Sequence, residues 1–276
     1  MQVLILGGDL RQVYLAEKLR EKGFQVSHYK DKEEVGEEAL RKRIKTSPLL
    51  ILPIPVTGDG TYLKGGGESR FLLDEIKESV TSGTKVFAGV FPKEFRRCLE
   101  ENGVECLDFM EMEEVALYNG IATAEGAVAE AVKLSHYNLH GKSCLVAGYG
   151  RCGKILADKL KGLNARVTIM ARKPEVRAMA EALGYETADF TIKPGEEYRF
   201  IFNTVPGPVF GENRLERVSR DCIIIDIAGA PGGTDFSYCE KHGIKAKLCS
   251  GLPGIYSPAS SGEILADAFL KIVKPE

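Results

Sequence analysis

The sequence predicts an α/β protein built from two doubly wound domains. Apolar strand-like segments alternate with amphipathic helix-like segments in two successive series, a pattern typical of parallel sheets covered by helices on both faces. In the second series, the first strand-like segment runs into a glycine-rich turn and then directly into a helical pattern. A chain of 276 residues is long enough for two such domains.

The first series predicts an N-terminal domain over residues 1–120, on the side where we expect the substrate. It opens with a strand at 2–6, followed by a helix at 10–22 whose apolar residues have helical spacing. Further strands are expected at 24–28, 49–52, 85–88 and 104–107, with helices at 68–80 and 92–101. The Pro- and Gly-rich segment 53–67 follows a strand and belongs at the carboxyl edge of this sheet.

The second series predicts a domain over residues 121–255, beginning with a connecting helix at 121–137 in which Ala and Glu favour helix. Its strands are expected at 143–147, 166–171, 199–202, 222–227 and 245–248. Residues 256–276 contain a final helix, near 260–273, that we expect to pack back on the N-terminal domain. Ligands of open parallel sheets bind beyond the carboxyl ends of the strands, so we expect a cleft between the two domains.

The turn of the second domain has the spacing Gly-x-Gly-x-x-Gly and consists of Gly148, Tyr149, Gly150, Arg151, Cys152 and Gly153. The first glycine permits a tight turn, the second lets a pyrophosphate approach the backbone, and the third lets the helix pack closely. Free N–H groups and the positive end of the helix dipole would face the phosphates. Because strands and a helix flank the motif, it predicts a Rossmann-like dinucleotide site in preference to a purely structural turn.

The residues after the next strand favour NADP over NAD. NAD-specific domains usually carry Asp or Glu at this place, whereas here Arg172 and Lys173 stand before Pro174. A guanidinium can hold a 2′-phosphate in a charge-assisted pair, and a carboxylate would repel it. The alternative is a solvated basic turn that precedes a helix begun by Pro174.

The turn after the strand at 199–202 is expected to border the nicotinamide ribose. Its residues are Asn203, Thr204, Val205 and Pro206. Asn203 and Thr204 can supply hydrogen bonds, and Pro206 stiffens the turn. In the segment that follows the next strand, we expect Thr234 or Asp235 to cap a helix.

Three further places can bind or react with a substrate. The segment Gly-Gly-Asp-Leu-Arg-Gln at 7–12 lacks a spaced third glycine, but its N–H groups could bind a carboxylate that Arg11 clamps. Alternatively, Asp9 only caps the helix and Arg11 is solvated. Ser260 and Ser261, with Ser257, could bind a carboxylate or only cap the final helix. Glu125 could act as a base, although composition favours an exposed helical glutamate.

Composition excludes several function classes. A net charge of −2 gives no drive toward nucleic acid or membranes, and no apolar run reaches membrane-spanning length. The first residues lack the basic region of a signal peptide, so we expect a cytoplasmic protein. The seven cysteines include no Cys-x-x-Cys pair and the four histidines have no metal-ligand spacing with them, so we expect no metal.

Taken together, these segments resemble the dipicolinate synthase A-subunit family. The matching pieces are Gly-Gly-Asp-x-Arg-Gln at 7–12, Leu-Pro-Ile-Pro at 52–55, Ala-Glu-Gly-Ala at 124–127, Gly-Tyr-Gly-Arg-Cys-Gly at 148–153, Ala-Arg-Lys at 171–173, Asn-Thr-Val-Pro at 203–206, Ile-Asp-Ile-Ala at 225–228, Pro-Gly-Gly-Thr-Asp-Phe at 231–236 and Gly-Leu-Pro-Gly at 251–254. The family commonly has Ala-Pro-Lys-Thr-Ala-Gly after this last piece, whereas here Ala259 replaces the lysine. Arg11 or the Ser260 and Ser261 hydroxyls would then substitute for it.

The resemblance implies a reaction and a partner. The reaction is the oxidation of dihydrodipicolinate, a cyclic dicarboxylate, to dipicolinate during sporulation, with NADP as the hydride acceptor. The partner is the flavoprotein-like B subunit of the synthase, and a homo-oligomer stays open. One alternative is a D-2-hydroxyacid-dehydrogenase-like oxidoreductase, although His242 is the only histidine in the second half available for its chemistry. The other is a non-catalytic dinucleotide-sensing subunit, which the lack of an obvious base leaves open.

Overall fold

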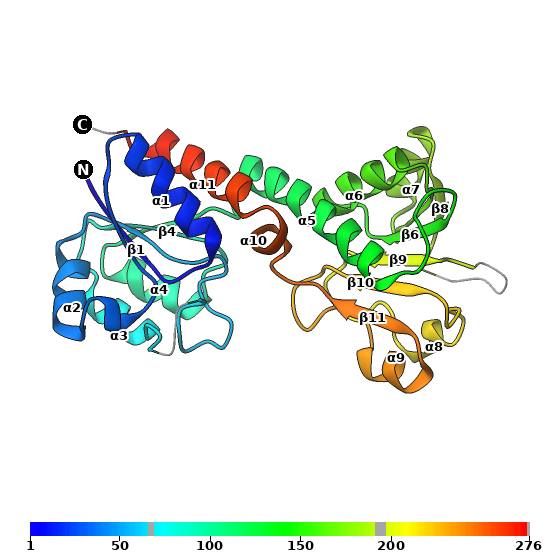
Figure 1. Ribbon diagram of the computed structural model, residues 1–276, viewed down its shortest axis with the longest axis horizontal. Helices are drawn as coiled ribbons and strands as arrows, with labels where there is room; N and C mark the ends of the chain where they lie inside the picture. Colours follow the sequence, from blue (N-terminus) through cyan, green and yellow to red (C-terminus); the bar gives the residue numbers. More distant parts are fainter. Residues whose placement is uncertain (66–68, 191–196, 275–276) are drawn as a thin grey trace. The chain divides into compact units, whose positions relative to one another are not determined.

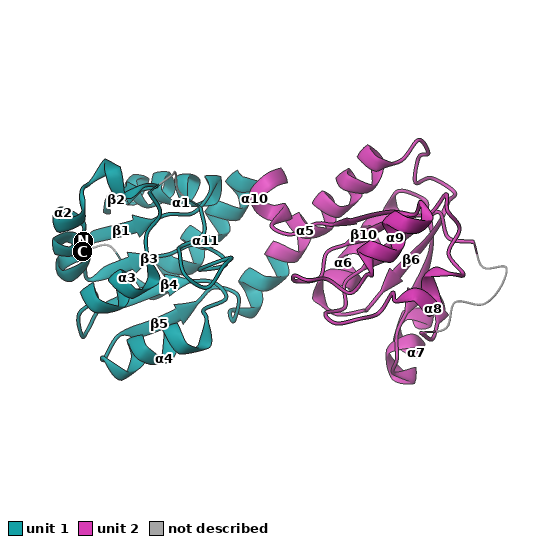
Figure 2. Ribbon diagram, turned by 90° about the horizontal axis from the view of Figure 1, so that it is seen from below, with its two compact units in different colours: residues 1–118, 257–276 teal, residues 119–256 magenta. Residues whose placement is uncertain are grey.

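The computed structural model describes residues 1–65, 69–190 and 197–274. The chain forms two compact units, which Figure 2 shows in different colours. Unit 1 consists of residues 1–118 and 257–276, and unit 2 consists of residues 119–256. Each unit has its own parallel sheet and its own helices, so the predicted fold class, two doubly wound α/β domains, is confirmed.

The sheet of unit 1 has the strand order β2-β1-β3-β4-β5, and every neighbouring pair is parallel. Its strands are β1 (Gln2–Leu6), β2 (Gln25–Tyr29), β3 (Leu49–Ile51), β4 (Lys85–Ala88) and β5 (Glu105–Asp108). The order of the strands reverses between β1 and β3. Ligands of such sheets bind beyond the carboxyl ends of the strands at this switch point.

Helices cover both faces of this sheet (Figure 1). They are α1 (Leu10–Glu21), the short η1 (Lys32–Glu34), α2 (Glu37–Thr46), α3 (Leu73–Ser79), α4 (Lys93–Glu101), the start of α5 (Glu113–Leu134) and α11 (Pro258–Ile272). One face packs on α2, α3 and α4 through Leu40, Ile76 and Leu99. The other packs on α1 and α11, where Phe87 and Phe269 lie 4.7 Å apart between ring centroids.

Helix α11 lies directly against α1. A Cβ atom at Gly262 would lie 2.6 Å from the main-chain oxygen of Arg11, so only glycine allows this approach. At its other end, Ile272 and Val273 line a pocket together with Leu49 and Lys85 at the starts of β3 and β4. Because α11 ends near the amino edge of the sheet, it begins at the carboxyl edge.

The sheet of unit 2 has the order β11-β10-β9-β6-β7-β8, again with every pair parallel. Its strands are β6 (Ser143–Ala147), β7 (Arg166–Met170), β8 (Glu186–Ala188), β9 (Phe200–Asn203), β10 (Ile223–Asp226) and β11 (Lys245–Leu248). Its helices are the rest of α5 with α6 (Arg151–Gly162), α7 (Pro174–Ala182), α8 (Glu212–Leu215), α9 (Phe236–His242) and α10 (Leu252–Tyr256). The switch point lies between β6 and β9, which places the glycine-rich turn there.

Several elements differ from the sequence prediction, among them one strand and two helices. The edge strand β8 was not predicted, because Glu-Thr-Ala carries neither an apolar run nor an alternation. The helix expected at 68–80 begins only at Leu73, since Phe71 and Leu72 pair with Leu63 and Tyr62. The connecting helix runs from Glu113 to Leu134 instead of over 121–137. None of the helices in the described part of the chain is long and apolar enough to cross a membrane.

Candidate functional site

The glycine-rich turn of unit 2 fits tightly between β6 and the turn after β9. Gly148 has a φ of +95°, and its N–H donates to the Met170 carbonyl oxygen at 2.9 Å. A Cβ atom at Gly148 would lie 2.4 Å from Thr204 Oγ1 and 2.8 Å from Val205 Cγ2. Both the backbone conformation and the space therefore require glycine here.

The other two glycines of the motif have different surroundings. A Cβ atom at Gly153 would lie 2.3 Å from the Gly148 carbonyl oxygen, so this glycine lets α6 approach the turn. A Cβ atom at Gly150 would meet nothing within 4 Å, and Gly150 caps α6 without a side-chain hydrogen bond. An open space thus faces the N–H groups at the start of a twelve-residue helix, which fits the pyrophosphate of a dinucleotide.

The variable residues of the motif serve the packing of unit 2. Tyr149 is buried and its ring lies 6.1 Å from that of Tyr185 in an edge-to-face arrangement. Cys152 is half-buried, and its Sγ lies near the position that a Cβ at Gly120 of α5 would take. Burial raises the pKa of the Cys152 thiol, so it stays protonated and acts as a packing residue. Arg151 is exposed in the first turn of α6.

Arg172 and Lys173 lie in the turn after β7, and both are exposed. Ala147 of β6 pairs with Met170 of β7, so this turn and the glycine-rich turn leave the same edge of the sheet. Arg177 of α7 fixes the turn, because its Nη1 donates to the carbonyl oxygens of Ala171 at 2.7 Å and Arg172 at 2.9 Å. Sequence analysis missed Arg177, although its position in the first turns of a helix begun by Pro174 was a usable signal.

The turn at 203–206 is held together by its own side chains. Asn203 is fully buried, and its Nδ2 donates to Asp226 Oδ1 at 3.0 Å and to the Val205 carbonyl oxygen at 3.2 Å. Thr204 Oγ1 donates to the Ala147 carbonyl oxygen at 2.9 Å. Both side chains thus use their donor protons inside the protein, in contrast to the expected bonds to a ribose. Val205 contacts the glycine turn, and Pro206 is exposed.

Asp226 organises the loops around this turn, and sequence analysis gave it no role. Its fully buried carboxylate accepts hydrogen bonds from Asn203 Nδ2, Ala228 N, Gly233 N and Thr234 Oγ1, at 2.7 to 3.0 Å. A carboxylate that closes an apolar strand was the available signal. Asp235, and not Thr234, caps α9 by accepting from the Tyr238 N–H at 2.9 Å.

In unit 1, the segment after β1 builds the start of α1. Asp9 accepts from the Arg11 N–H at 3.0 Å, and Gln12 Oε1 accepts from the Asp9 N–H at 2.9 Å, which completes a capping box. A Cβ atom at Gly8, whose φ is +89°, would lie 2.5 Å from the Gln12 side chain. Asp9 therefore caps α1, as one of the two alternatives for this segment predicted.

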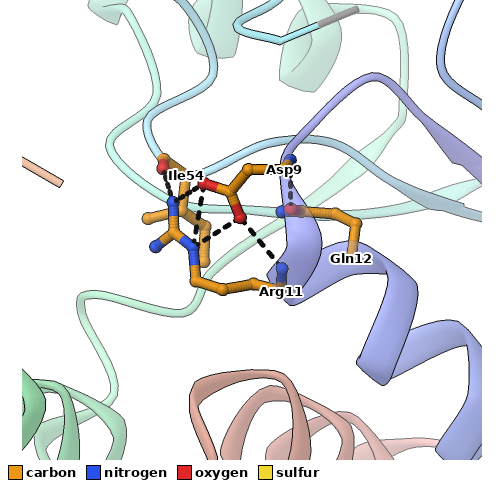
Figure 3. Close-up of polar contacts among 4 residues, drawn as sticks. All are labelled: Asp9, Arg11, Gln12 and Ile54. Carbon is orange, nitrogen blue, oxygen red and sulfur yellow. Dashed lines mark hydrogen bonds and ion pairs between the residues drawn. The ribbon is translucent and has the colours of Figure 1, made fainter. Parts of the chain in front are cut away.

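Arg11 is buried between the loops after β1 and β3, and its side chain is only 5% exposed. Its Nε donates to Asp9 Oδ1 at 2.9 Å, and its Nη2 donates to Asp9 Oδ2 at 2.8 Å and to the Ile54 carbonyl oxygen at 2.6 Å (Figure 3). The alternative of a solvated Arg11 is therefore wrong. Among the described residues, no acceptor bonds to its Nη1, which leaves that donor for a ligand.

The ion pair also sets the charge of Asp9. Burial favours the neutral carboxyl, but the hydrogen bonds and the positive charge of Arg11 outweigh it and lower the pKa of Asp9 below its usual value. Asp9 therefore stays ionised and keeps the guanidinium in place. A fixed guanidinium loses little freedom when an anion binds, which favours binding.

Lys64 is a second cation at this switch point, and sequence analysis missed it. Its main chain is fixed by two bonds, because its carbonyl oxygen accepts from Gly8 N and its N–H donates to the Val56 carbonyl oxygen, both at 2.9 Å. Its side chain is half-buried and pairs with no carboxylate within the described ranges. Burial and then the charge of Arg11 lower the pKa of Lys64. No local motif marks it, since its position depends on the contact with Gly8.

The start of α11 lies in the same unit as Arg11. Ser257 occupies the capping position without a side-chain hydrogen bond, and Ser260 is exposed. Ser261 is only 4% exposed, and its Oγ has no hydrogen-bond partner in the described part of the chain. Since Gly262 touches the main chain of Arg11, the fold brings these serines and Arg11 to one region of unit 1. Ala259 is half-buried and carries no charge.

Glu125 belongs to unit 2 and is exposed on α5. Its Oε1 lies 2.7 Å from Lys159 Nζ of α6, so it forms a surface ion pair. It thus lies in a different unit from Arg11, Ser260 and Ser261.

Comparisons with known proteins cover the whole chain. A family model of the N-terminal domain of the dipicolinate synthase A subunit matches residues 2–110. The A subunit of the Bacillus subtilis dipicolinate synthase is 28% identical over 99% of this chain and 96% of its own length. The crystal structure of the corresponding A subunit from Bacillus halodurans has a TM-score of 0.86 and 29% identity, and the match covers 100% of this chain and 98% of that one.

A more distant likeness concerns the fold alone. The D-lactate dehydrogenase of Escherichia coli matches with a TM-score of 0.73 at 14% identity, over 99% of this chain and 96% of that one. The likeness to the two dipicolinate synthase proteins is greater and covers both units, including the segments after β1 and β6. The chain is therefore similar over its whole length to dipicolinate synthase A subunits, and its residues 2–110 match the model of their N-terminal domain.

Proposed function

We propose that this chain is the A subunit of a dipicolinate synthase and oxidises dihydrodipicolinate to dipicolinate with NADP as the hydride acceptor. The observation that carries the proposal is the glycine-rich turn of unit 2, in a chain that matches its Bacillus subtilis relative over 99% of its length. Gly148 and Gly153 leave no room for a side chain, whereas the space beside Gly150 is open. The cytosol, the sporulation pathway and a complex with the B subunit of the synthase are further parts of this proposal.

The cofactor is assigned to unit 2. When bound, the nicotinamide supplies the hydride acceptor. The N–H groups at the start of α6 would bind the pyrophosphate, and Arg172 with Lys173 would hold the 2′-phosphate of NADP. No carboxylate stands among residues 170–174, but Glu175 Oε1 lies 4.0 Å from Lys173 Nζ, so the proposal rests chiefly on Arg172. Because Asn203 and Thr204 use their donors internally, their expected role becomes the shaping of the turn beside Gly148.

The dicarboxylate substrate is assigned to unit 1. Arg11 and Lys64 lie at the switch point of its sheet, and within residues 1–65, 69–190 and 197–274 Asp9 is the carboxylate that interacts with both. Among these described groups, two cations and one anion leave a net positive charge, which attracts a carboxylate. The exposed Ser260 and the unpartnered Ser261 hydroxyl are proposed as further hydrogen-bond donors from α11.

The reaction balances without any further oxidant. The dihydropyridine ring loses a hydride to NADP⁺ and one proton, and the ring becomes an aromatic pyridine that keeps both carboxylates. Aromatisation makes the step downhill, so the protein chiefly has to orient the ring and fix its carboxylates. Glu125 is the proton acceptor to test first, and its surface ion pair with Lys159 leads us to expect that a Glu125→Gln variant retains most of its turnover.

The test is direct. Dihydrodipicolinate is generated in solution, and the chain is added with NADP or NAD, each with and without the B subunit of the synthase. Dipicolinate that forms faster with NADP supports the proposal, and its dependence on that partner reports on the complex. Tight NADP binding without product in any combination would instead support a dinucleotide-sensing role. Turnover of 2-hydroxyacids would support the dehydrogenase alternative, for which His242 is poorly placed because it hydrogen-bonds the Tyr238 carbonyl oxygen.

A further inference from the structure

Val90 has an unusual backbone conformation at the carboxyl edge of unit 1. Its φ is +57°, in the left-handed region, where the branched Cβ of valine is strongly disfavoured. The only other described non-glycine residue with a positive φ is Asn164, and asparagine tolerates this region. The side chain of Val90 is also exposed, with 57% of its surface open to solvent.

The neighbours of Val90 hold it in this conformation. The Gly89 N–H donates to the Pro53 carbonyl oxygen at 3.3 Å, and the Gly89 carbonyl oxygen accepts from Val56 N at 3.0 Å. On the other side, the Phe91 N–H donates to Asp108 Oδ2 at 3.2 Å. The segment after β4 is therefore hydrogen-bonded both to the loop after β3 and to the end of β5. Val90 lies between these two sets of hydrogen bonds.

The same contacts connect Val90 to the proposed carboxylate site. A Cβ atom at Gly89 would lie 2.7 Å from Ile54 Cγ2, so the two loops are in close contact. Ile54 in turn accepts a hydrogen bond from Arg11 Nη2 at 2.6 Å. The exposed isopropyl group of Val90 thus lies on the loop after β4. This loop packs against the loop after β3, which binds the Arg11 guanidinium.

This combination does not serve the fold. An exposed valine gains little from burial, and glycine or asparagine would adopt the same φ without strain. Backbone strain of this kind is concentrated at ligand sites, where the side chain has a use outside the folded chain itself. Ligands of this sheet type bind at the edge where Val90 lies.

We propose that Val90 determines specificity by packing its isopropyl group against the ring of the dicarboxylate whose carboxylate Arg11 binds. This inference rests on the proposed function. A site that combines a guanidinium with an apolar side chain selects a ligand that has an anionic group directly attached to an apolar ring. An open-chain dicarboxylate offers the charge without the ring, so Val90 discriminates against it.

The experiment compares Val90→Asn with Val90→Ile and with Asn164→Gly as the matched control. Val90→Asn removes both the strain and the apolar group, so we expect Tm to rise by about 2–4 °C. We expect its KM for dihydrodipicolinate to rise about threefold to tenfold, with kcat and the Kd for NADP within about twofold. Val90→Ile should keep KM and Tm close to those of the natural chain. Asn164→Gly should leave KM unchanged.

A purely structural Val90 would give a different result. If Val90→Asn raised Tm and left KM unchanged, the inference would be overturned, and an equal rise of KM in Val90→Ile would overturn it too. If the natural chain showed no turnover, the proposed function would fail, and the Kd for pyridine-2,6-dicarboxylate would decide on Val90. If only Val90→Asn bound pyridine-2,6-dicarboxylate more weakly than the natural chain, the role of Val90 would be supported. If all variants bound it equally, or if even the natural chain did not bind it, the role of Val90 would be overturned.

Discussion

Arg11 and Asp9 show how one ion pair can serve both the fold and the site. The carboxylate caps α1 and holds the guanidinium, and the guanidinium also ties the loop after β3 through the Ile54 carbonyl oxygen. Removing the charge while keeping the cap separates these roles. The Asp9→Asn substitution does this, because the amide oxygen can still accept from the Arg11 N–H.

We expect Asp9→Asn to lower the free energy of unfolding at pH 7 by about 1–3 kcal/mol, as for a lost charged hydrogen bond at a half-exposed site. The pKa of Asp9 is lowered in the folded chain, so its stabilisation is present above the unfolded value of 3.8 and is lost as the pH falls through the folded value. Urea titrations at neutral and acid pH measure the free energy of unfolding of Asp9→Asn and of the natural chain. The two free energies should converge at a pH below the folded pKa of Asp9. Asp267→Asn, in an exposed pair with Lys18, is the control.

The cofactor preference is also a property of single residues. Arg172→Ala should weaken NADP binding by about 1–3 kcal/mol and leave NAD binding little changed, because only NADP carries the 2′-phosphate. Calorimetric titration of both cofactors measures this directly. Arg41→Ala, at an exposed ion pair of unit 1, controls for the loss of charge. Equal losses for NADP and NAD would contradict the 2′-phosphate assignment.

His28 makes the stability of unit 1 depend on pH. Burial lowers the pKa of this histidine below 6.5, and its Nε2 lies 3.0 Å from the Gly7 carbonyl oxygen. Because the unfolded chain then binds the proton more tightly, stability is lost as the pH falls below 6.5. We expect Tm to fall less steeply between neutral pH and about pH 5 in His28→Gln than in the natural chain, as scanning calorimetry would show. Parallel slopes would contradict a half-buried, neutral His28.

At the scale of elements, the strand–turn–helix unit of β6 and α6 allows its glycines to be tested one by one. Gly153→Ala places a Cβ 2.3 Å from the Gly148 carbonyl oxygen, so the turn must shift. We expect both stability and cofactor affinity to fall. Gly150→Ala meets no protein atom within 4 Å and should leave stability nearly unchanged, while its methyl group occupies space next to the phosphates and weakens cofactor binding about tenfold or more.

The control for this pair is Gly162→Ala at the end of α6, where a Cβ also meets nothing. It should leave the cofactor Kd unchanged and stabilise the helix by about 0.5–1 kcal/mol. Thermal unfolding and cofactor titration of the three variants together give the answer. A Gly150→Ala variant that binds the cofactor normally would place the phosphates elsewhere.

Periodicity predicted the elements well wherever a strand or helix has a local pattern. The strands at 2–6 and 143–147 have the predicted bounds, because a complete apolar run is bounded by a turn in each. The partners of the site residues could not be predicted, since they come from distant segments. Asp226 engages Asn203 from 23 residues away, and Arg11 reaches Ile54 across 43 residues. Lys64 and the φ of Val90 likewise depend on contacts between loops, which no local pattern encodes.

At the scale of the molecule, the two units have separate roles in the proposal and should respond to different ligands. A cofactor present at about 100 times its Kd stabilises the structure that it binds by about 2.7 kcal/mol. We therefore expect NADP to slow amide hydrogen exchange chiefly in β6, β9 and α6, and pyridine-2,6-dicarboxylate to slow it chiefly after β1, β3 and β4. If NADP instead slowed exchange chiefly in unit 1 and the dicarboxylate chiefly in unit 2, the cofactor would belong to unit 1 and the substrate to unit 2.

The path of the chain through unit 1 has a consequence for how the protein is made. Leu265 and Phe269 of α11 complete a core whose other residues, such as Val3 and Phe87, come from the first part of the chain. All of unit 2 lies between these two parts. On the ribosome, the Rossmann unit is therefore translated in full while the core of unit 1 still lacks a helix. The proposed substrate side becomes complete only after translation has passed the whole of the cofactor side.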